Sequence, residues 1–343
     1  MADARQLPLR DRSVDCCVTS PPYWGLRDYG HGDQIGLEPT LDAYVQALVA
    51  VFQEVRRVLK PDGTCWVNLG DSYANDGKWG GETGGKQSYL PDNDRQRVGR
   101  SKRLTGLKPK DMVGIPWAVA FALRDDGWYL RSDIIWAKPN PMPESVTDRP
   151  TKAHEYLFLL AKSEHYYYNA AAIREPYAES TLTQFEQPYT GLGLKDYAAA
   201  GVQNPSDIKR RITDKQRGHS RRHAGFNDRW DAMPKDEQQQ EGANKRTVWA
   251  VAPQPYSGAH FATMPEALIE PCILAGCPLG GLVLDPFIGS GTVGAVAERL
   301  GRRWVGTDLS YQSLAQKRTA QRGLRFENDE QVPSAGAVAG TDT

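Results

Sequence analysis

Short continuous apolar runs alternate along the chain with segments whose apolar residues recur every three or four positions. The runs at 14–18, 65–71 and 282–284 predict buried strands, because a strand covered on both faces is apolar almost throughout. Between the first two runs, helical periodicity over 41–59 predicts an amphipathic helix, for which Thr40 is a suitable N-cap. This alternation of strand and helix is typical of an α/β fold.

The rest of the chain extends this pattern, with long polar stretches between the elements. In chain order it predicts an end of the first helix at 61–63, a helix over 111–126, a strand over 128–136, a strand over 154–162, a helix over 265–275, a helix after 292, a strand over 304–308 and a last helix around Leu314. At 343 residues the chain exceeds one average domain. One large α/β domain with a smaller inserted or appended one is therefore expected.

The stretch Thr19-Ser20-Pro21-Pro22-Tyr23, which follows the first apolar run, carries the most distinctive chemistry of the chain. Two prolines fix their own φ near about −65° and remove two backbone donors, so the loop is stiff and presents carbonyl acceptors. Ser20 adds a hydroxyl, and Tyr23 adds a flat ring for a planar substrate to stack on. The stretch predicts a site for an exocyclic amine, with a turn packed on the core as the alternative.

A glycine loop near the other end of the chain predicts a nucleoside site. The apolar run 282–284 leads into the residues DPFIGSGT at 285–292, which is typical of a strand, a glycine loop and a helix start. The next predicted strand closes on Asp308. Glycines allow the backbone to approach a ligand closely, and an acid at the end of the neighbouring strand can accept ribose hydroxyls.

Together, SPPY at 20–23, DPFIGSGT at 285–292 and VGTD at 305–308 resemble the amino-group DNA methyltransferases that use S-adenosylmethionine. The tetrapeptide precedes the glycine loop, with a long segment between them, which resembles the permuted β-type order of that family. The resemblance spans about Asp3 to Arg318, and the joint occurrence of the motifs is far more specific than either alone. It implies a Rossmann-like, doubly wound, mostly parallel sheet with an inserted target recognition region, and S-adenosyl-L-methionine as the cofactor.

The resemblance also implies roles for individual residues. It makes Asn68 and Asp71, at the end of the second strand, further candidates near the substrate, with loop capping as the alternative. Asp3 and Pro265 are implied to contact the cofactor. The alternative for Asp3 is a solvated acid at a frayed terminus, and the alternative for Pro265 is an ordinary role at the start of a helix. The implied catalytic residues are Ser20, Pro21, Pro22 and Tyr23, and the implied cofactor-binding residues are Asp285, Phe287, Gly289, Gly291, Thr292, Asp308, Phe261, Thr263, Pro265 and Asp3.

The implied mechanism is catalysis by positioning and electrostatics. An aromatic amine is a poor nucleophile because its lone pair is delocalised into the ring. Ser20 Oγ and the Pro21 carbonyl, by accepting its two hydrogens, would point the lone pair at the sulfonium methyl without a covalent intermediate. A base in a duplex must be flipped out and stacked against Tyr23, and both Tyr23 and Phe287 can face the sulfonium.

The methylated base is expected to be cytosine, at N4. In the family, Ser in the first position of the tetrapeptide is typical of cytosine N4 enzymes, whereas Asp or Asn is typical of adenine N6 enzymes, so adenine N6 is the alternative. Methylation at carbon 5 of cytosine would need an attacking thiolate. Because Cys272, in the Pro-Cys pair at 271–272, lies on the apolar face of a predicted helix, it is expected in the core.

Forty-two basic and forty-two acidic residues cancel, so only local clusters of cations can indicate nucleic acid. One cluster lies in a glycine-rich loop over 76–110, and another lies in the segment 174–246, where the resemblance places the target recognition region. Both clusters predict contacts with DNA phosphates. The alternative is a solvated surface for the loop at 76–110 and a disordered linker for the segment 174–246. The predicted DNA-binding residues are Arg95, Arg97, Arg100, Lys102, Arg103, Lys209, Arg210, Arg211, Arg217, Arg221 and Arg222.

The expected organisation is a catalytic half at 1–173, a target recognition region at 174–246, a cofactor-binding half at 247–326 and a disordered tail at 327–343. Five cysteines without CxxC spacing predict neither a disulfide framework nor a metal site. No apolar run approaches the roughly 20 residues that span a bilayer, and the first residues lack the pattern of a signal peptide. The chain is therefore expected to be soluble and cytoplasmic, of prokaryotic or phage type.

The expected partner is double-stranded DNA, with no membrane. The resemblance also allows a homodimer and a cognate restriction endonuclease that acts separately, as in restriction-modification. Two rival classes remain. A methyltransferase that acts on RNA or protein is one, although the long basic insert fits a large polyanion better than a peptide. A non-catalytic DNA-binding module is the other, and it is disfavoured by the intact Ser20, Tyr23, Gly289, Gly291 and Asp308.

Overall fold

The computed structural model describes residues 3–25, 34–74, 106–177, 242–254 and 264–308. The chain divides into two compact units, one of Met1–Ala172 with Arg246–Thr343 and one of Ile173–Lys245. In the second unit, the described residues include a bridge between Glu175 and Ala243, and Lys245 pairs with Glu175 at 3.2 Å. The sheet and the helices that pack on it belong to the first unit.

The first unit is built on a seven-stranded sheet in the order β5-β3-β4-β2-β1-β6-β7. β4 runs antiparallel to both of its neighbours, β2 and β3, and the other pairs in the sheet are parallel. The strands are β1 (Val14–Thr19), β2 (Leu59–Leu69), β3 (Tyr129–Ala137), β4 (His154–Ala161), β5 (Val248–Ala250), β6 (Leu282–Asp285) and β7 (Arg303–Gly306).

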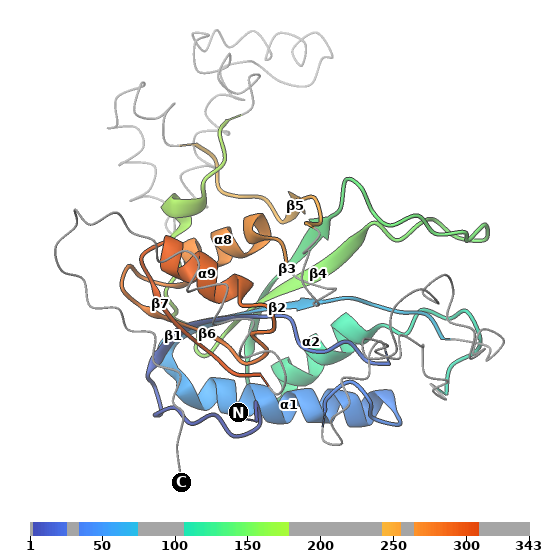
Figure 1. Ribbon diagram of the computed structural model, residues 1–343, viewed down its shortest axis with the longest axis horizontal. Helices are drawn as coiled ribbons and strands as arrows, with labels where there is room; N and C mark the ends of the chain where they lie inside the picture. The colour runs from blue at the N-terminus through green and yellow to red at the C-terminus, as the bar shows by residue number, and fades with distance from the viewer. Residues whose placement is uncertain (1–2, 26–33, 75–105, 178–241, 255–263, 309–343) are drawn as a thin grey trace, which may run out of the picture. The chain divides into compact units, whose positions relative to one another are not determined.

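Helices cover both faces of this sheet (Figure 1). α1 (Leu41–Val58) and α2 (Ile115–Asp125) pack together on one face, and α8 (Glu266–Gly276) and α9 (Thr292–Arg299) pack together on the other. A short 3₁₀ helix, η2 (Ala170–Ile173), follows β4. The predicted fold class, a doubly wound and mostly parallel α/β sheet, is therefore confirmed.

The order of the strands creates a switch point between β1 and β6. These strands are parallel neighbours, with Cys16 opposite Val283 and Cys17 opposite Leu284. The chain leaves β1 toward α1 on one face and leaves β6 toward α9 on the other (Figure 1). Open α/β sheets bind ligands in the crevice at the carboxyl ends of such strands. The SPPY loop and the glycine loop follow these two strands, so both reach this crevice.

The core explains why the sequence forms these elements. The side chains of Tyr44, Leu48 and Phe52 on the apolar face of α1 are fully buried in the core. Burial of each such side chain stabilises the fold by about 1.5–3 kcal/mol. The predicted N-cap is confirmed, because the Thr40 side chain accepts a hydrogen bond from the backbone N–H of Ala43 at 3.2 Å.

Two predicted boundaries were wrong. The helix α1 ends at Val58 and passes directly into β2, so residues 61–63 lie inside a strand and do not end the helix. They form an irregularity, since the partner of Val14 is Leu59 but the partner of Cys16 is Thr64. The second wrong boundary is the start of α2, which was expected at about 111.

α2 begins at Ile115 because Gly114 precedes it in a left-handed conformation, with φ of 79°, which a right-handed helix cannot include. Predictions for residues 26–30, for most of 76–110 and 174–246, for the helix around Leu314 and for the tail lie outside the described residues. The five cysteines are buried free thiols. In the described parts of the chain, no helix is both long and apolar enough to cross a membrane.

Candidate functional site

The polar residues of the SPPY loop, of the glycine loop and of the end of β7 gather at one edge of the sheet, where the parallel strands end. Because β4 runs the other way, its first residues lie at the same edge. The residues there are Ser20 to Tyr23 after β1, Asn68 and Asp71 at the end of β2, Lys138 after β3, Glu155 at the start of β4, Asp285 to Thr292 after β6 and Asp308 after β7.

The two loops of the switch point are tied together at their roots. The hydroxyl of Thr19 donates to Oδ1 of Asp285 at 2.6 Å, and the backbone N–H of Phe287 donates to the same oxygen at 3.0 Å. Burial raises the pKa of Asp285 to about 7, although these two hydrogen bonds lower it and the charge of Asp308 raises it. The Asp285 carboxyl therefore shapes the start of the glycine loop and fixes it to β1.

The glycine loop is held in turn by the end of β7. The backbone N–H of Gly289 donates to Oδ2 of Asp308 at 3.0 Å, and the N–H of Ile288 donates to the carbonyl of Thr307 at 3.0 Å. Gly291 is left-handed, with φ of 81°, and precedes α9, so the loop turns sharply into that helix. The glycine loop, the N-terminus of α9 and the partly exposed Asp308 therefore lie together at this edge.

Two further members of the implied cofactor group show different surroundings. Thr292, the first residue of α9, is buried, and its hydroxyl lies 3.2 Å from that of Ser290. Phe287 is partly exposed at the start of the loop. Thr292 is thus placed to shape the loop, whereas the ring of Phe287 packs against the hydrophobic core and stays partly exposed.

The SPPY loop is anchored by one of its two proline carbonyls. The Tyr44 hydroxyl on α1 donates to the carbonyl of Pro22 at 2.9 Å. Among the described residues, no donor reaches the carbonyl of Pro21. Ser20 is partly exposed beside it. Pro21 itself is buried, and the Ser20 side chain hydrogen-bonds Tyr23.

The tyrosine of the SPPY loop is held by a polar cluster that the sequence analysis did not find. The Tyr23 hydroxyl donates to Oε2 of Glu155 at 2.6 Å, and Asn68 Nδ2 donates to both of these oxygens at 2.8 Å. Lys138 Nζ donates to Oε1 of Glu155 at 2.5 Å and lies 4.4 Å from the centre of the Trp136 ring. We call Asn68, Lys138 and Glu155 the tyrosine clamp.

The charges of the tyrosine clamp follow from its contacts. Burial alone would raise the pKa of Glu155, but the charge of Lys138 and its hydrogen bond outweigh burial, and the pKa lies below its usual value. Burial and then the charge of Glu155 raise the pKa of Tyr23 well above its usual value. Glu155 is therefore a carboxylate at neutral pH, and Tyr23 is a neutral phenol that donates to it.

The remaining candidates divide into different groups. Asn68 belongs to the tyrosine clamp, whereas Asp71 caps α2 by accepting from the N–H groups of Gly114 and Ile115 at 3.0 Å each. The carboxylate of Asp3 pairs with Arg5 at 2.6 Å, which lowers its pKa.

Pro265 precedes α8, and its carbonyl accepts from the N–H of Leu268 at 3.0 Å. Phe261, Thr263 and all the predicted DNA-binding cations lie outside the described residues. Cys272 is buried in α8, with 1% of its surface exposed, as expected of a core residue.

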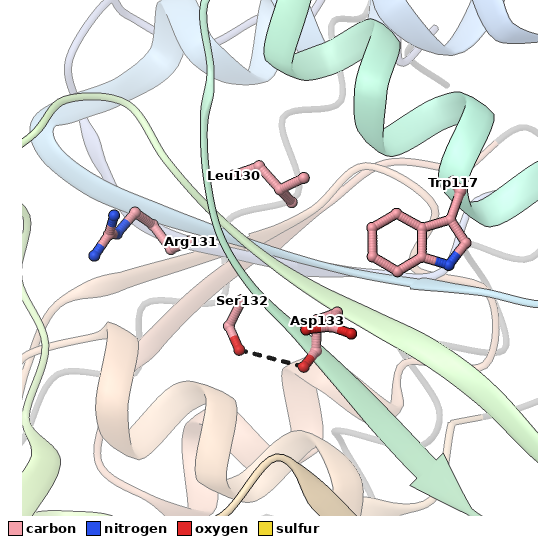
Figure 2. Close-up of a pocket in the computed structure, with 5 residues that line it drawn as sticks. All are labelled: Trp117, Leu130, Arg131, Ser132 and Asp133. Atoms are coloured by element: carbon pink, nitrogen blue, oxygen red, sulfur yellow. Dashed lines mark hydrogen bonds between the residues drawn. The ribbon is translucent and has the colours of Figure 1, made fainter.

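A small surface hollow lies on another part of the sheet (Figure 2). It is formed by the first half of β3 and by Trp117 of α2, and its lining is Trp117, Leu130, Arg131, Ser132 and Asp133. The Ser132 hydroxyl donates to the backbone carbonyl of Asp133 at 3.3 Å. Residues singled out for chemistry do not line this hollow, so the candidate site is the edge described above.

Known proteins resemble this sequence over most of its length. A family model described as DNA methylase, of the N6 and N4 type, matches residues 14–317. The type II methyltransferase M.SmaI of Serratia marcescens is 42% identical over 332 residues, which cover 94% of this chain and 90% of that protein. The type II methyltransferase M.Cfr9I of Citrobacter freundii is 45% identical over 310 residues, covering 89% and 80% respectively.

Solved structures share the fold at lower sequence identity. The PvuII DNA methyltransferase, described as cytosine-N4-specific, matches with a TM-score of 0.54 and 17% identity, covering 96% of this chain and 86% of that one. A putative DNA modification methylase of Thermus thermophilus, solved with S-adenosyl-L-methionine, matches with a TM-score of 0.50 and 22% identity, covering 95% of both chains.

Proposed function

We propose, from the premise that the chain belongs to the family of S-adenosylmethionine-dependent N6 and N4 DNA methylases, that it methylates the exocyclic N4 amine of a flipped cytosine in duplex DNA. The family fixes the reaction type, the cofactor and a DNA substrate. Type II methyltransferase relatives also connect it with restriction-modification. The choice of cytosine N4 over adenine N6 is the proposal.

One observation carries the assignment of the site. The two acceptors of the SPPY loop, Ser20 Oγ and the Pro21 carbonyl, stand at the root of the glycine loop, because Thr19 is bonded to Asp285 at 2.6 Å. The carbonyl of Pro22 is occupied by Tyr44, which leaves that of Pro21 for the substrate. An amine held by two such acceptors faces a ligand bound along the glycine loop.

The work of the chain is to hold the amine and the cofactor in line. S-adenosylmethionine, when bound, supplies an electrophilic methyl group on sulfonium sulfur. Ser20 and Pro21 accept the two amine hydrogens, which directs the nitrogen lone pair away from the base ring. Tyr23 offers its ring for stacking of the flipped base, and Phe287 offers a second ring near the glycine loop. The backbone at Gly289 and Gly291 leaves room for the cofactor.

Cytosine is favoured over adenine by the serine of the tetrapeptide. A neutral hydroxyl is a sufficient acceptor for the cytosine amine, whereas an acid in the same position would draw more strongly on the adenine amine. The solved PvuII methyltransferase, described as cytosine-N4-specific, has the same fold. Adenine N6 is the second candidate within the family.

DNA contact is assigned to two parts of the chain. The unit Ile173–Lys245 is proposed as the target recognition region, because it forms a compact unit separate from the sheet domain and its sequence is rich in Arg and Lys. The basic loop at 76–110 is proposed to follow phosphates. A homodimer and a separate restriction endonuclease remain proposals that rest on the family resemblance.

The decisive experiment identifies the methylated nucleoside. The purified protein is incubated with duplex DNA and labelled S-adenosylmethionine, and the DNA is digested and analysed by mass spectrometry. N4-methylcytosine is the expected product. N6-methyladenine would overturn the choice of base, and the absence of label in any DNA that carries potential targets would overturn the DNA substrate.

A matched pair of variants tests the role of Ser20 in the same assay. Ser20→Ala removes one of the two amine acceptors, so kcat is expected to fall at least tenfold while the Kd for S-adenosylmethionine stays within twofold. Ser132→Ala removes a hydroxyl from β3 that bonds only its own strand among the described residues, and kcat is expected to be unchanged. An unchanged kcat in Ser20→Ala would remove Ser20 from the mechanism.

A further inference from the structure

We infer that Glu155 is a positioning residue for methyl transfer: as part of the tyrosine clamp, it fixes the ring of Tyr23 against which the target base stacks. The inference rests on the proposed function, because a base must be held for its amine to react. It concerns residues of β2 and β4 and one residue just after β3, all of which lie outside the motifs SPPY and DPFIGSGT.

The contacts of the clamp converge on one phenol. Glu155 accepts from the Tyr23 hydroxyl at 2.6 Å, while Asn68 donates to the tyrosine oxygen and to the carboxylate at 2.8 Å each. On another side the ring lies against Gly70, where an added Cβ would be 2.6 Å from Tyr23 Cε2. The ring is therefore held both at its hydroxyl and along its edge, so its orientation is set before a base arrives.

The composition of the clamp is costly for a purely structural role. Glu155 and Lys138 expose only 16% and 19% of their side chains, and a largely buried ion pair is seldom more stabilising than apolar residues of the same volume. Asn68 is almost fully buried, and its Oδ1 has no hydrogen-bond partner among the described residues. A buried acceptor without a hydrogen bond lowers the free energy of unfolding by about 1–3 kcal/mol.

The amide of Asn68 is thus oriented to donate twice, toward Tyr23 and Glu155, at the expense of its own oxygen. Expensive polar geometry of this kind is retained where a precise orientation is useful, and here it is aimed at the ring of the SPPY loop. The fixed ring reduces the loss of freedom when a base stacks, which is one way that positioning raises kcat.

A double-mutant cycle tests whether Glu155 acts through the tyrosine hydroxyl. The variants are Glu155→Gln, Tyr23→Phe and the combination, assayed for methyl transfer to a plasmid DNA that the wild-type protein methylates. Each single variant is expected to lower kcat about tenfold, with the Kd for S-adenosylmethionine within twofold of wild type. The combined variant is expected to match Tyr23→Phe within twofold, because one interaction is lost in both.

Two outcomes overturn the inference. If kcat of Glu155→Gln is within twofold of wild type, Glu155 does not position the ring. If the losses multiply in the combined variant, Glu155 acts independently of the tyrosine hydroxyl. A wild-type protein that methylates no DNA would overturn the proposed function itself, so the two failures are distinguishable. Glu54→Gln, which removes a carboxylate bonded to Arg57 and Leu7, is the matched control and keeps the wild-type kcat.

A pH profile separates positioning by charge from a loss of folding. The titratable groups that face Glu155 are Tyr23 after β1, Lys138 after β3 and Lys152 before β4. Lys138→Met removes the charge and the hydrogen bond that lower the pKa of Glu155. Burial then raises the pKa of Glu155. The kcat of Lys138→Met is then expected to fall as pH is lowered, in a limb that the wild type lacks. A profile parallel to wild type would show that the charge of Glu155 is irrelevant.

Discussion

The hydroxyl of Thr19 donates a 2.6 Å hydrogen bond to Oδ1 of Asp285, which lies 266 positions later in the chain. Thr19 is the residue before the SPPY loop, and Asp285 begins the glycine loop. A single hydrogen bond thus joins the roots of the two loops on neighbouring strands of the switch point. A change that loosens it is expected to alter the distance between the proposed amine site and the proposed cofactor site.

Thr19→Val tests this link. The change removes the donor and leaves a buried carboxyl with one fewer partner, so the free energy of unfolding is expected to fall by about 1–3 kcal/mol. Methyl transfer is also expected to fall, with weaker binding of S-adenosylmethionine, because the glycine loop loses its tie to β1. Urea unfolding and calorimetric titration with the cofactor measure the two effects.

The matched control is Thr64→Val. Thr64 is also fully buried, but it lies at the middle of β2 near Cys16 and Gly276, away from the carboxyl edge. The Thr64→Val variant is expected to be less stable than wild type and to bind S-adenosylmethionine with unchanged affinity. Equal cofactor affinities in Thr19→Val and wild type would show that the hydrogen bond is only structural.

Asp285 also makes the stability of the protein depend on pH. Its pKa is about 7 in the folded protein, above the value of about 3.9 for an unfolded chain. Between these values the folded state holds more protons than the unfolded state, so the free energy of unfolding falls as pH rises from about 4 to 7 and levels off above. The effect is about 4 kcal/mol at most.

The measurement is urea unfolding of wild type and Asp285→Asn at several pH values from 5 to 8. The asparagine cannot ionise, so the variant is expected to lack this part of the decline with pH. Parallel pH profiles for the two proteins would mean that Asp285 ionises in the folded protein as it does in the unfolded chain.

Much of this arrangement could be predicted from the sequence. The strands β1 and β6 are mostly apolar because they are buried interior strands of the sheet, and the loops that follow them contain local motifs. The helix α1 shows its periodicity and its cap over neighbouring residues. In each case the residues that make up the sequence pattern are close together in the chain and form the element that the pattern predicts.

What could not be predicted depends on residues that are distant in the chain. Glu155 meets Tyr23 across 132 positions, and the direction of β4, which brings it there, leaves no trace in an apolar run. The feature of the sequence that points to the clamp is Glu155, a single carboxylate at the start of the buried strand β4. Asp71 likewise gained its role from Gly114, 43 positions later, whose left-handed conformation starts α2.

The capping role of Asp71 gives a prediction of its own. Asp71→Ala leaves the first N–H groups of α2 without their acceptor, so the free energy of unfolding is expected to fall by about 0.5–2 kcal/mol. Because its carboxylate bonds Gly114 and Ile115 and not the SPPY loop, kcat is expected to stay within twofold of wild type. A tenfold loss of kcat at unchanged stability would return Asp71 to the substrate site.

Tyr44→Phe tests the anchor of the SPPY loop. The hydroxyl of this buried residue bonds the Pro22 carbonyl at 2.9 Å, and its removal is expected to cost about 0.5–1.5 kcal/mol of stability. The loop is then less restrained, so kcat is expected to fall several-fold. Tyr129→Phe, at an exposed position at the start of β3, is the control and should leave both quantities unchanged. A loss of stability with full kcat would show that the loop keeps its geometry without this anchor.

The last prediction uses two glycines that each face an aromatic ring. A Cβ at Gly70 would lie 2.6 Å from Cε2 of Tyr23, and a Cβ at Gly294 would lie 2.8 Å from the ring of Trp304. Both alanine variants force a ring to move and are expected to lower stability by about 1–3 kcal/mol. Their effects on function are expected to differ, because one ring belongs to the SPPY loop and the other belongs to β7 and packs against α9.

Gly70→Ala is expected to lower kcat at least tenfold while the Kd for S-adenosylmethionine stays near wild type, since the displaced ring is the one proposed to stack the base. Gly294→Ala is expected to weaken cofactor binding, because α9 begins at the glycine loop and moves with it. Single-turnover methylation and calorimetric titration of both variants measure this crossed pattern. If Gly70→Ala instead weakened cofactor binding and left the single-turnover rate intact, the ring of Tyr23 would belong to the cofactor site and not to the site of the base.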